Sequence, residues 1–266
     1  MIRDDRIRST PMIRPRAFTL VELLVVIILI GLLMALLLPA LGAARRTAQQ
    51  RQNDTQVRGL HQAMVTFAEG NRSFFPGIRA NNTLIGANNG DTGIDTDPSG
   101  TSGGRKGNFV AVRHEILLDG SYITGAYVIS PAEDKTEWTI GSVDQNNYSY
   151  AMLRIHYRAQ GMGFAPNLTA ARNEEWRNTL NAQAVVVADR NTGSNGVNAV
   201  SSIHTTRESG KWEGSVAFND GRVTYETAHD QLDLKYGSHN LVQEDNLFMD
   251  NDGGESVDNA MIVYNQ

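Results

Sequence analysis

Acidic side chains near the C-terminal end of the sequence are spaced as the ligands of a hard cation would be. Asp250, Asp252 and Glu255 alternate with small residues in the segment 250–256, which contains two glycines that permit a sharp turn. Carboxylate oxygens in such a turn are ligands that Ca²⁺ prefers. The segment is not an EF-hand loop, because no Glu stands at its twelfth position. It is either a Ca²⁺ site, with Ca²⁺ as the one cofactor indicated, or a solvated acidic tail.

A second set of polar residues could form a metal or acid–base cluster if the chain brings them together. Asp189 follows the apolar run 184–188, His204 precedes a loop, and Asp220 begins an Asp-Gly pair. Each residue also has a local explanation, since Asp189 and Asp220 suit turns and His204 suits a hydrogen bond within a loop. Their spacing leaves both interpretations open.

Nothing else in the sequence indicates catalysis. It contains no HExxH pair, no G-x-S-x-G elbow and no glycine-rich phosphate loop. The remaining histidines are scattered: His61, His114, His156, His229 and His239. We therefore predict that the protein is not an enzyme.

The whole-chain composition describes an ordinary acidic protein but hides three unlike segments. The 266 residues carry a formal charge of −5 and no cysteine, which excludes disulfides, Cys-based metal sites and a basic nucleic-acid face. Residues 1–17 carry five Arg and two Asp, whereas residues 18–44 carry Glu22 as their single charge. The chain from Arg45 onward is strongly acidic. A basic head, an apolar stem and an acidic body therefore follow one another.

The apolar stem predicts a membrane-spanning helix. From Leu23 to Leu38 sixteen consecutive residues are uncharged, and the segment 18–44 would form about 40 Å of helix, enough to cross a hydrocarbon core of about 30 Å. Three kinds of membrane segment fit: a cleaved secretory signal ending near residues 39–43, a plain signal anchor, and a prepilin-type stem. Arginines flank the stem on both sides, so charge asymmetry does not fix its orientation.

Glu22 distinguishes these alternatives. A carboxylate inside an apolar span costs a few kcal/mol and is retained mainly where a partner neutralises it. The sequence Arg16-Ala17 followed by Phe18-Thr19-Leu20-Val21-Glu22 resembles the processing site of type IV pilins and type II secretion pseudopilins. Pro39 also lies where many stems of that family have a helix-bending proline. Ala17 departs from the family pattern, which more often has Gly before the cleaved bond.

The resemblance implies a route of processing and assembly. A prepilin peptidase would cleave between Ala17 and Phe18 and methylate the new amine, and Glu22 would serve as an assembly charge for that amine on an adjoining subunit. It implies as partners the peptidase, other pilin or pseudopilin subunits, an assembly platform protein with its ATPase, and membrane lipid. It implies an inner-membrane, single-pass protein with a cytoplasmic N-terminus and a periplasmic body, later part of a filament in the periplasm or at the cell surface. Major pseudopilins also hold Ca²⁺ near their C-terminus, which bears on Asp250.

The sequence of the body predicts a sheet that packs on the continuation of the stem helix. Val57, Leu60 and Met64 recur at helical spacing and Gly70 is a plausible stop, so an amphipathic helix is predicted over 45–70. The segment 79–107 is rich in glycine and predicts a long loop, where Asp91, Asp95 and Asp97 form a weaker candidate cation site. A short helix is predicted from Phe109 to Asp119, and another over 174–180. Strands are predicted at 122–129, 148–153, 184–188 and 215–225.

The segment 215–225 carries the clearest local signal of the body. Two alternating runs flank Asp220-Gly221, a pair that favours a tight hairpin turn. His204 followed by this strand–Asp-Gly–strand element resembles the C-terminal part of a bacterial pilin-like group, although the gap between them is wider here.

Together these features predict an α+β, pilin-like fold, with a long N-terminal transmembrane and amphipathic helix packed on an antiparallel β-sheet body. The expected segments are a leader at 1–17, the transmembrane half of the helix at 18–44, its amphipathic half at 45–70, and a β-rich body at 71–266. The expected function is that of a structural prepilin or pseudopilin subunit of a type II secretion pseudopilus or type IV pilus-like filament. The alternative is an exported or membrane-anchored surface module that binds a glycan or depends on Ca²⁺.

Overall fold

A computed structural model of the protein describes residues 19–78, 109–154, 174–193, 200–205, 210–237, 240–248 and the backbone of 262–263. Ala17 and Phe18, the loop 79–107 and the acidic segment 250–256 lie outside the described residues. The chain divides into two compact units, residues 1–47 and residues 48–266.

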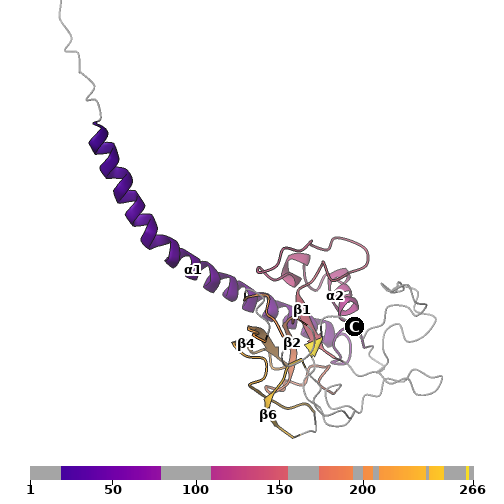
Figure 1. The fold of residues 1–266 in the computed structure, drawn as a ribbon. Coiled ribbons are helices and arrows are strands. Elements are labelled where there is room, and N and C mark those ends of the chain that lie inside the picture. The colour runs from indigo at the N-terminus through magenta and orange to yellow at the C-terminus, as the bar shows by residue number, and fades with distance from the viewer. Residues whose placement is uncertain are drawn as a thin grey trace, which may run out of the picture. The chain divides into compact units, whose positions relative to one another are not determined.

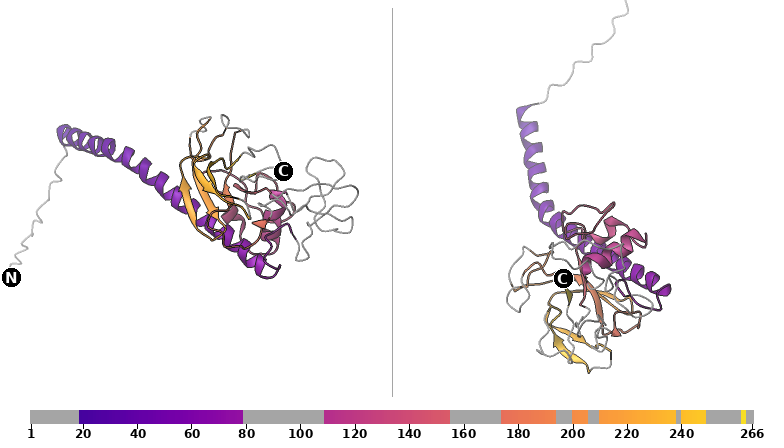
Figure 2. Two further views of the ribbon diagram at one scale, coloured as in Figure 1. Left: turned by 90° about the horizontal axis from the view of Figure 1, so that it is seen from below. Right: turned by 90° about the vertical axis from the view of Figure 1, so that its right-hand side faces the viewer.

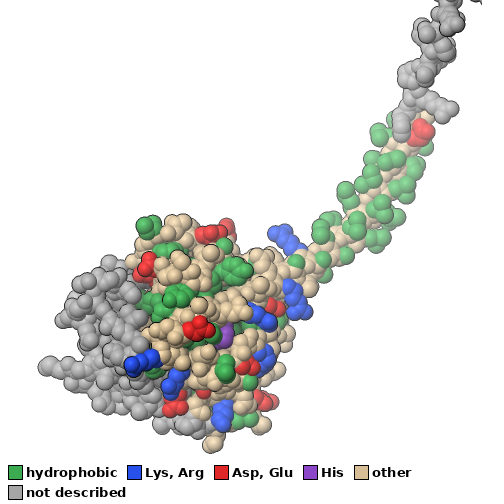
Figure 3. Space-filling model, turned by 180° about the vertical axis from the view of Figure 1, so that it is seen from behind, with side chains coloured by type: hydrophobic (Ala, Val, Ile, Leu, Met, Phe, Trp, Pro, Cys, Tyr) green, Lys and Arg blue, Asp and Glu red, His purple; other side chains and the backbone are tan. Residues whose placement is uncertain are grey.

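The first unit is the apolar half of helix α1, which runs from Leu20 to Glu69 (Figure 1). Its apolar side chains are exposed along the described chain, from Leu20 at 80% to Leu41 at 66%. Figure 3 shows hydrophobic side chains all along this half of the helix on the face in view. Pro39 lies inside α1, and helical structure continues past it. Among the described residues, α1 is the helix whose length and hydropathy would allow it to cross a membrane.

The second half of α1 belongs to the body and buries one face. Its buried residues recur every three or four positions, which is the spacing of one side of a helix: Asn53, Gln56, Val57, Leu60, His61, Ala63, Met64 and Ala68. The helix ends at Glu69, and the side-chain amide of Asn71 donates to the carbonyls of Phe74 and Ile78 (3.1 and 2.6 Å). The amphipathic helix and its stop at Gly70 are therefore confirmed.

An antiparallel sheet lies along this half of α1, as the views in Figures 1 and 2 show. Its strand order is β4-β3-β2-β1-β7. The strands are β1 (Tyr150–Leu153), β2 (Val185–Asp189), β3 (Gly214–Phe218), β4 (Val223–Glu226) and β7 (Ile262–Val263). β1, β2 and β3 are buried at every position, which places them at the centre of the body. The predicted α+β class, a long N-terminal helix with an antiparallel sheet, is confirmed.

The hairpin between β3 and β4 forms at the predicted Asp-Gly pair. The amide of Gly221 donates to the carbonyl of Phe218 (3.0 Å), and the amide of Phe218 donates to the carbonyl of Arg222 (2.9 Å). Gly221 has φ of +86°, a conformation that glycine adopts without steric cost. The connection is therefore a three-residue loop that ends in a left-handed glycine.

The backbone at a bulge in β2 is hydrogen-bonded by Tyr236, which follows the first strand of a second, smaller sheet. This sheet pairs β5 (Leu232–Leu234) with β6 (Val242–Asp245). The register between β2 and β3 shifts between Val185 and Val187. There the buried hydroxyl of Tyr236 accepts from the amide of Val185 (3.0 Å) and donates to its carbonyl (2.9 Å). The polar backbone freed by the bulge is thus satisfied.

Two sequence predictions were wrong in the body. The segment 122–129 is not a strand but contains a 3₁₀ helix, η1 (Gly125–Val128), whose Ala126 carbonyl accepts from Gln56 of α1 (2.9 Å). The segment 174–180 is helical at Glu174 alone: backbone hydrogen bonds join the residues after it to residues 73–75, including Asn178 N to the Ser73 carbonyl (2.8 Å). In both places contact with a distant segment prevails over local propensity. The short helix α2 (Val110–Asp119) forms as predicted.

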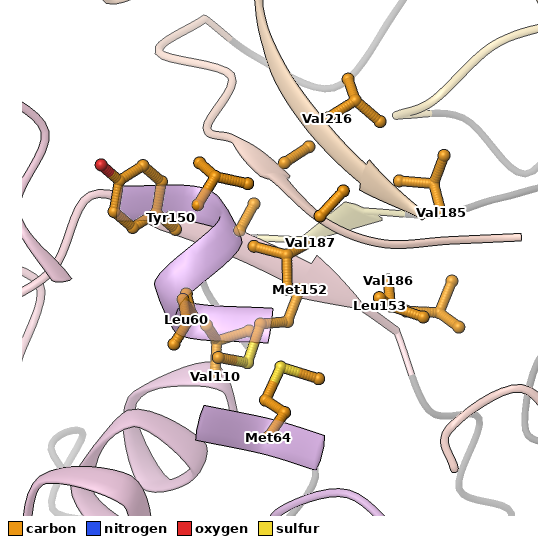
Figure 4. Packing of buried hydrophobic residues seen from close by; sticks show 14 of the residues in the cluster. Leu60, Met64, Val110, Tyr150, Met152, Leu153, Val185, Val186, Val187 and Val216 are labelled. Atoms are coloured by element: carbon orange, nitrogen blue, oxygen red, sulfur yellow. The ribbon is translucent and has the colours of Figure 1, made fainter. Parts of the chain in front are cut away.

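The core lies between the sheet and the two helices. Figure 4 shows Leu60 and Met64 of α1 and Val110 of α2 gathered beside Met152 of β1 and Val187 of β2. All five side chains are 1% exposed or less. Burial of such side chains contributes roughly 1.5–3 kcal/mol each, so the cysteine-free body is held by its apolar core.

Candidate functional site

The candidate site at the start of α1 is built from two residues, Thr19 and Glu22. The Thr19 hydroxyl accepts from the amide of Glu22 (3.2 Å), while the Glu22 carboxylate accepts from the amide and the hydroxyl of Thr19 (2.8 and 2.7 Å). This reciprocal arrangement is a capping box, which satisfies otherwise unpaired donors at a helix start. In the isolated chain, Glu22 therefore helps to cap the start of α1. Its position in an apolar span did not predict this role.

The surface that follows Glu22 is suited to lipid or to other apolar helices. Leu23, Ile27, Leu32 and Leu38 are each at least 59% exposed, and the other aliphatic side chains of the stem are exposed as well. Soluble monomers rarely expose a contiguous apolar patch of this extent, which marks membrane or protein contact. Glu22 is the one acidic side chain at its start.

A polar network at the centre of the body joins α1 to the sheet. The side-chain amide of Asn53, which is fully buried, donates to the Asp189 carboxylate (2.7 Å) and to the Ser215 hydroxyl (2.8 Å). Its carbonyl oxygen accepts from the hydroxyls of Ser130 (2.6 Å) and Tyr150 (3.0 Å). Asn53 thus connects α1, β1, β2 and β3 and the segment that follows η1.

Asp189 and His204 are brought together in this network. His204 Nε2 lies 2.9 Å from Asp189 Oδ2, and that oxygen also accepts from the amide of Ser215 (2.6 Å). Asp189 is fully buried, and the His204 ring packs edge-on against Tyr225. Burial lowers the pKa of His204, but the hydrogen bond and charge of Asp189 raise it by more, so the net pKa lies above its ordinary value.

Asp220 takes no part in that contact. It lies in the β3–β4 turn, where its Oδ1 accepts from the amide of Arg222 (2.9 Å), and its charge acts instead on His61 of α1. Burial lowers the pKa of His61 despite that charge. The described residues contain no group of three or more His, Cys, Asp or Glu side chains able to hold a metal ion. The candidate Ca²⁺ ligands Asp250, Asp252 and Glu255 lie outside the described residues, so that site remains a prediction.

The His204–Asp189 pair predicts a pH dependence of stability. Because the folded pKa of His204 is raised, the pair stabilises the fold below the unfolded pKa of about 6.5, and this stability is lost as pH rises through the folded value. The free-energy difference between wild type and His204→Gln should therefore be larger near pH 5.5 than near pH 8.5. Urea unfolding of the full chain in detergent at both pH values measures it. Equal differences would contradict the charged pair.

The unfolding free energy of His204→Gln must be compared with that of wild type at each pH, because other histidines change the stability in the opposite direction as pH changes. Burial lowers the pKa of His114 to about 3, and burial also lowers the pKa of His229. Their contributions fall as pH falls, but they are common to both chains and cancel in the comparison. Besides Asp189, the charges of Glu213 and Asp54 act on His204 and raise its pKa.

Sequence reasoning missed the centre of this network. The helical pattern of Val57, Leu60 and Met64 does not include Asn53, yet the structure buries Asn53 completely. The signal available was its register, since Asn53 lies four and seven positions before the core residues Val57 and Leu60. A polar residue on the apolar face of a helix indicates a buried hydrogen-bond network.

A second polar cluster, also not predicted, involves Glu133. Its carboxylate accepts two hydrogen bonds from Arg190 Nε (both 3.1 Å) and one from Arg190 Nη2, and Lys135 Nζ lies 3.5 Å away. Burial raises the pKa of Glu133, but the hydrogen bond and charge of Arg190 lower it by more. Burial lowers the pKa of Lys135 to about 8. The hydrogen bonds and ion pairs of this cluster connect the segment after η1 to the end of β2.

Comparison with known proteins identifies one region of the chain. A model of the prokaryotic N-terminal methylation motif matches residues 12–38. This motif is the prepilin-type cleavage and methylation signal of type IV pilins and pseudopilins. No curated protein and no solved structure matches the chain. The chain therefore carries a prepilin signal at the start of its exposed apolar helix, and that signal implies processing by a prepilin peptidase and assembly with other pilin subunits.

Proposed function

We propose that this chain is the precursor of a pilin-like subunit that assembles into a type II secretion pseudopilus or a type IV pilus-like filament. The observation that carries the proposal is the coincidence of the methylation motif at 12–38 with a helix whose apolar first half is exposed throughout. Such a helix has two stable environments, a membrane before assembly and a bundle of like helices after it. The stem anchors the precursor in the inner membrane, with the body on the periplasmic side.

Processing creates a positive charge at the start of the stem, and this charge can pair with the carboxylate of Glu22. A prepilin peptidase cleaves between Ala17 and Phe18, and the methylated amine of Phe18 remains cationic. In the filament this amine pairs with Glu22 of an adjoining subunit, and the pairing offsets the cost of a carboxylate in an apolar medium. Before assembly, the hydrogen bonds of the capping box with Thr19 satisfy the carboxylate of Glu22, so the precursor is stable in the membrane.

The direct test is to look for the body on filaments. Filaments sheared from cells that contain the chain's own assembly platform and ATPase should carry the body, as judged by immunogold labelling with antibodies to residues 48–266. A body found only as a membrane monomer, or only as a secreted protein cleaved near Gly42, would contradict the proposal. The second outcome would favour the alternative of an exported binding module. Neighbouring genes for a secretion channel or for pilus retraction would separate the two kinds of filament.

A further inference from the structure

A cavity of about 270 Å³ opens on the body between the approach to β3 and the segment that follows β4. Trp212 and Glu213 line it from the first side, and His229 and Asp230 line it from the second. Thr205 completes the wall, and Lys211 is exposed at the rim. None of these residues belongs to the stem or is hydrogen-bonded to Asn53.

Three residues that line the cavity carry buried polar atoms for which the described part of the chain provides no hydrogen-bond partner. Trp212 is 2% exposed and His229 is 4% exposed. Trp212 Nε1, His229 Nε2 and Thr205 Oγ1 are buried and have no hydrogen-bond partner among the described residues. Buried polar groups are nearly always paired, so three unpaired atoms around one cavity point to a ligand that supplies their partners.

The rings that line the cavity are held in place from behind. Phe248 packs edge-on against Trp212, with ring centroids 5.3 Å apart, and also contacts the ring of His229 at 6.4 Å. Their indole and imidazole groups are therefore fixed before any ligand arrives. Preorganised donors cost less entropy on binding than mobile ones.

The charges around the cavity select a neutral, hydroxyl-rich ligand. Among the lining residues that the structure describes, Glu213 and Asp230 are half-buried carboxylates and Lys211 at the rim is the one cation. Burial lowers the pKa of His229 by more than the charge of Asp230 raises it, so the imidazole is neutral at pH 7. The excess of negative charge disfavours anions. Hydroxyl groups can donate to the carboxylates and accept from the indole N–H, and so match both kinds of partner.

We propose that this cavity binds a single sugar ring, either as a free monosaccharide or as the end of a glycan. A cavity of about 150 Å³ holds benzene, which has six non-hydrogen atoms, so a volume of about 270 Å³ suits a ligand of about a dozen non-hydrogen atoms. Trp212 Nε1 donates to one ring hydroxyl, Glu213 and Asp230 accept from others, and His229 Nε2 and Thr205 Oγ1 complete the set. Exposed Gly210 and Thr227 leave the rim open, so a glycan can continue into solvent.

The test is ligand-observed saturation-transfer NMR on the full chain in a detergent without a sugar headgroup. The probes are the methyl glycosides of glucose, galactose, mannose and N-acetylglucosamine. At least one should bind saturably with a Kd of about 1 mM. Trp212→Phe, which keeps the ring packing and removes the N–H, should weaken that binding about fivefold, and Glu213→Gln should do so at least as strongly.

Matched variants outside the cavity control for general damage. Trp138→Phe removes an indole whose Nε1 donates to the Gly141 carbonyl, and Glu137→Gln neutralises an exposed carboxylate beside it. Both should bind as wild type. Saturable binding of none of the glycosides, equal affinity in all five chains, or preferred binding of inorganic phosphate or choline would overturn the proposal. If an oligosaccharide binds as tightly as its terminal glycoside, the ligand is the end of a glycan. If the oligosaccharide binds more weakly, the ligand is a free monosaccharide.

Discussion

A chain with Glu22→Gln is expected to insert into the membrane and lose its leader, yet to enter filaments about a hundredfold less often than wild type. The reason is the charge of the carboxylate. Without it, the methylated amine of Phe18 on the adjoining subunit is left unpaired in an apolar medium, at a cost of about 2.5–3.5 kcal/mol. Sheared filaments and membranes from the same cells, blotted for the body, measure the incorporated fraction.

Gln is the informative substitution because it separates the two roles of Glu22. A capping box accepts Glu or Gln at its third position, so Glu22→Gln keeps the hydrogen bonds with Thr19 and removes only the charge. Glu22→Val removes both and should fail equally. A result in which Gln assembles normally while Val does not would mean that Glu22 acts through the cap, and charge pairing would be contradicted. Glu69→Gln, at the far end of the same helix, is the control and should assemble as wild type.

The second large effect is expected from Asn53→Ala, which should lower the free energy of unfolding of the body by about 3 kcal/mol. The substitution leaves the buried Asp189 carboxylate and the hydroxyls of Ser130 and Tyr150 without their shared partner. A buried hydrogen bond contributes about 0.5–1.5 kcal/mol, and one to a charged group about 1.5–3 kcal/mol, so the loss of these bonds together amounts to about 3 kcal/mol. Urea unfolding of the full chain in detergent, followed by near-UV circular dichroism, measures the change.

Gln62→Ala provides the matched control on the same helix. Gln62 is an exposed amide side chain, so its removal should change the free energy of unfolding by about 0.5 kcal/mol or less. If Asn53→Ala were no more damaging than Gln62→Ala, the network would not hold α1 to the sheet. Glu22 and Asn53 thus predict separate defects, one in assembly and one in folding.

The features that the sequence predicted well are those set by local patterns. The stem follows from an uninterrupted apolar run, and the β3–β4 hairpin follows from Asp220-Gly221 between alternating residues. The stop of α1 follows from Gly70-Asn71. In each case neighbouring residues alone determine the structure, because helix periodicity, turn geometry and hydropathy act over a few positions.

The features that it predicted badly depend on residues far apart in the chain. The segment 122–129 looked like a strand, but Gly59 of α1 leaves room for the ring of Tyr127, since a Cβ at residue 59 would lie 2.9 Å from that ring. Close packing on the helix thus replaces pairing with a strand. The contact of Asp189 with His204 and the separate place of Asp220 depend likewise on the sheet order. Spacing in the sequence contains no such information.

The most direct test of the proposed function is the mass of the N-terminal peptide of the protein extracted from its own membranes. The account predicts that the chain begins at Phe18 and that the Phe18 amine carries a methyl group, as the motif at 12–38 implies. A mature N-terminus at Met1, or one near Ala43 as a secretory signal would leave, would contradict it.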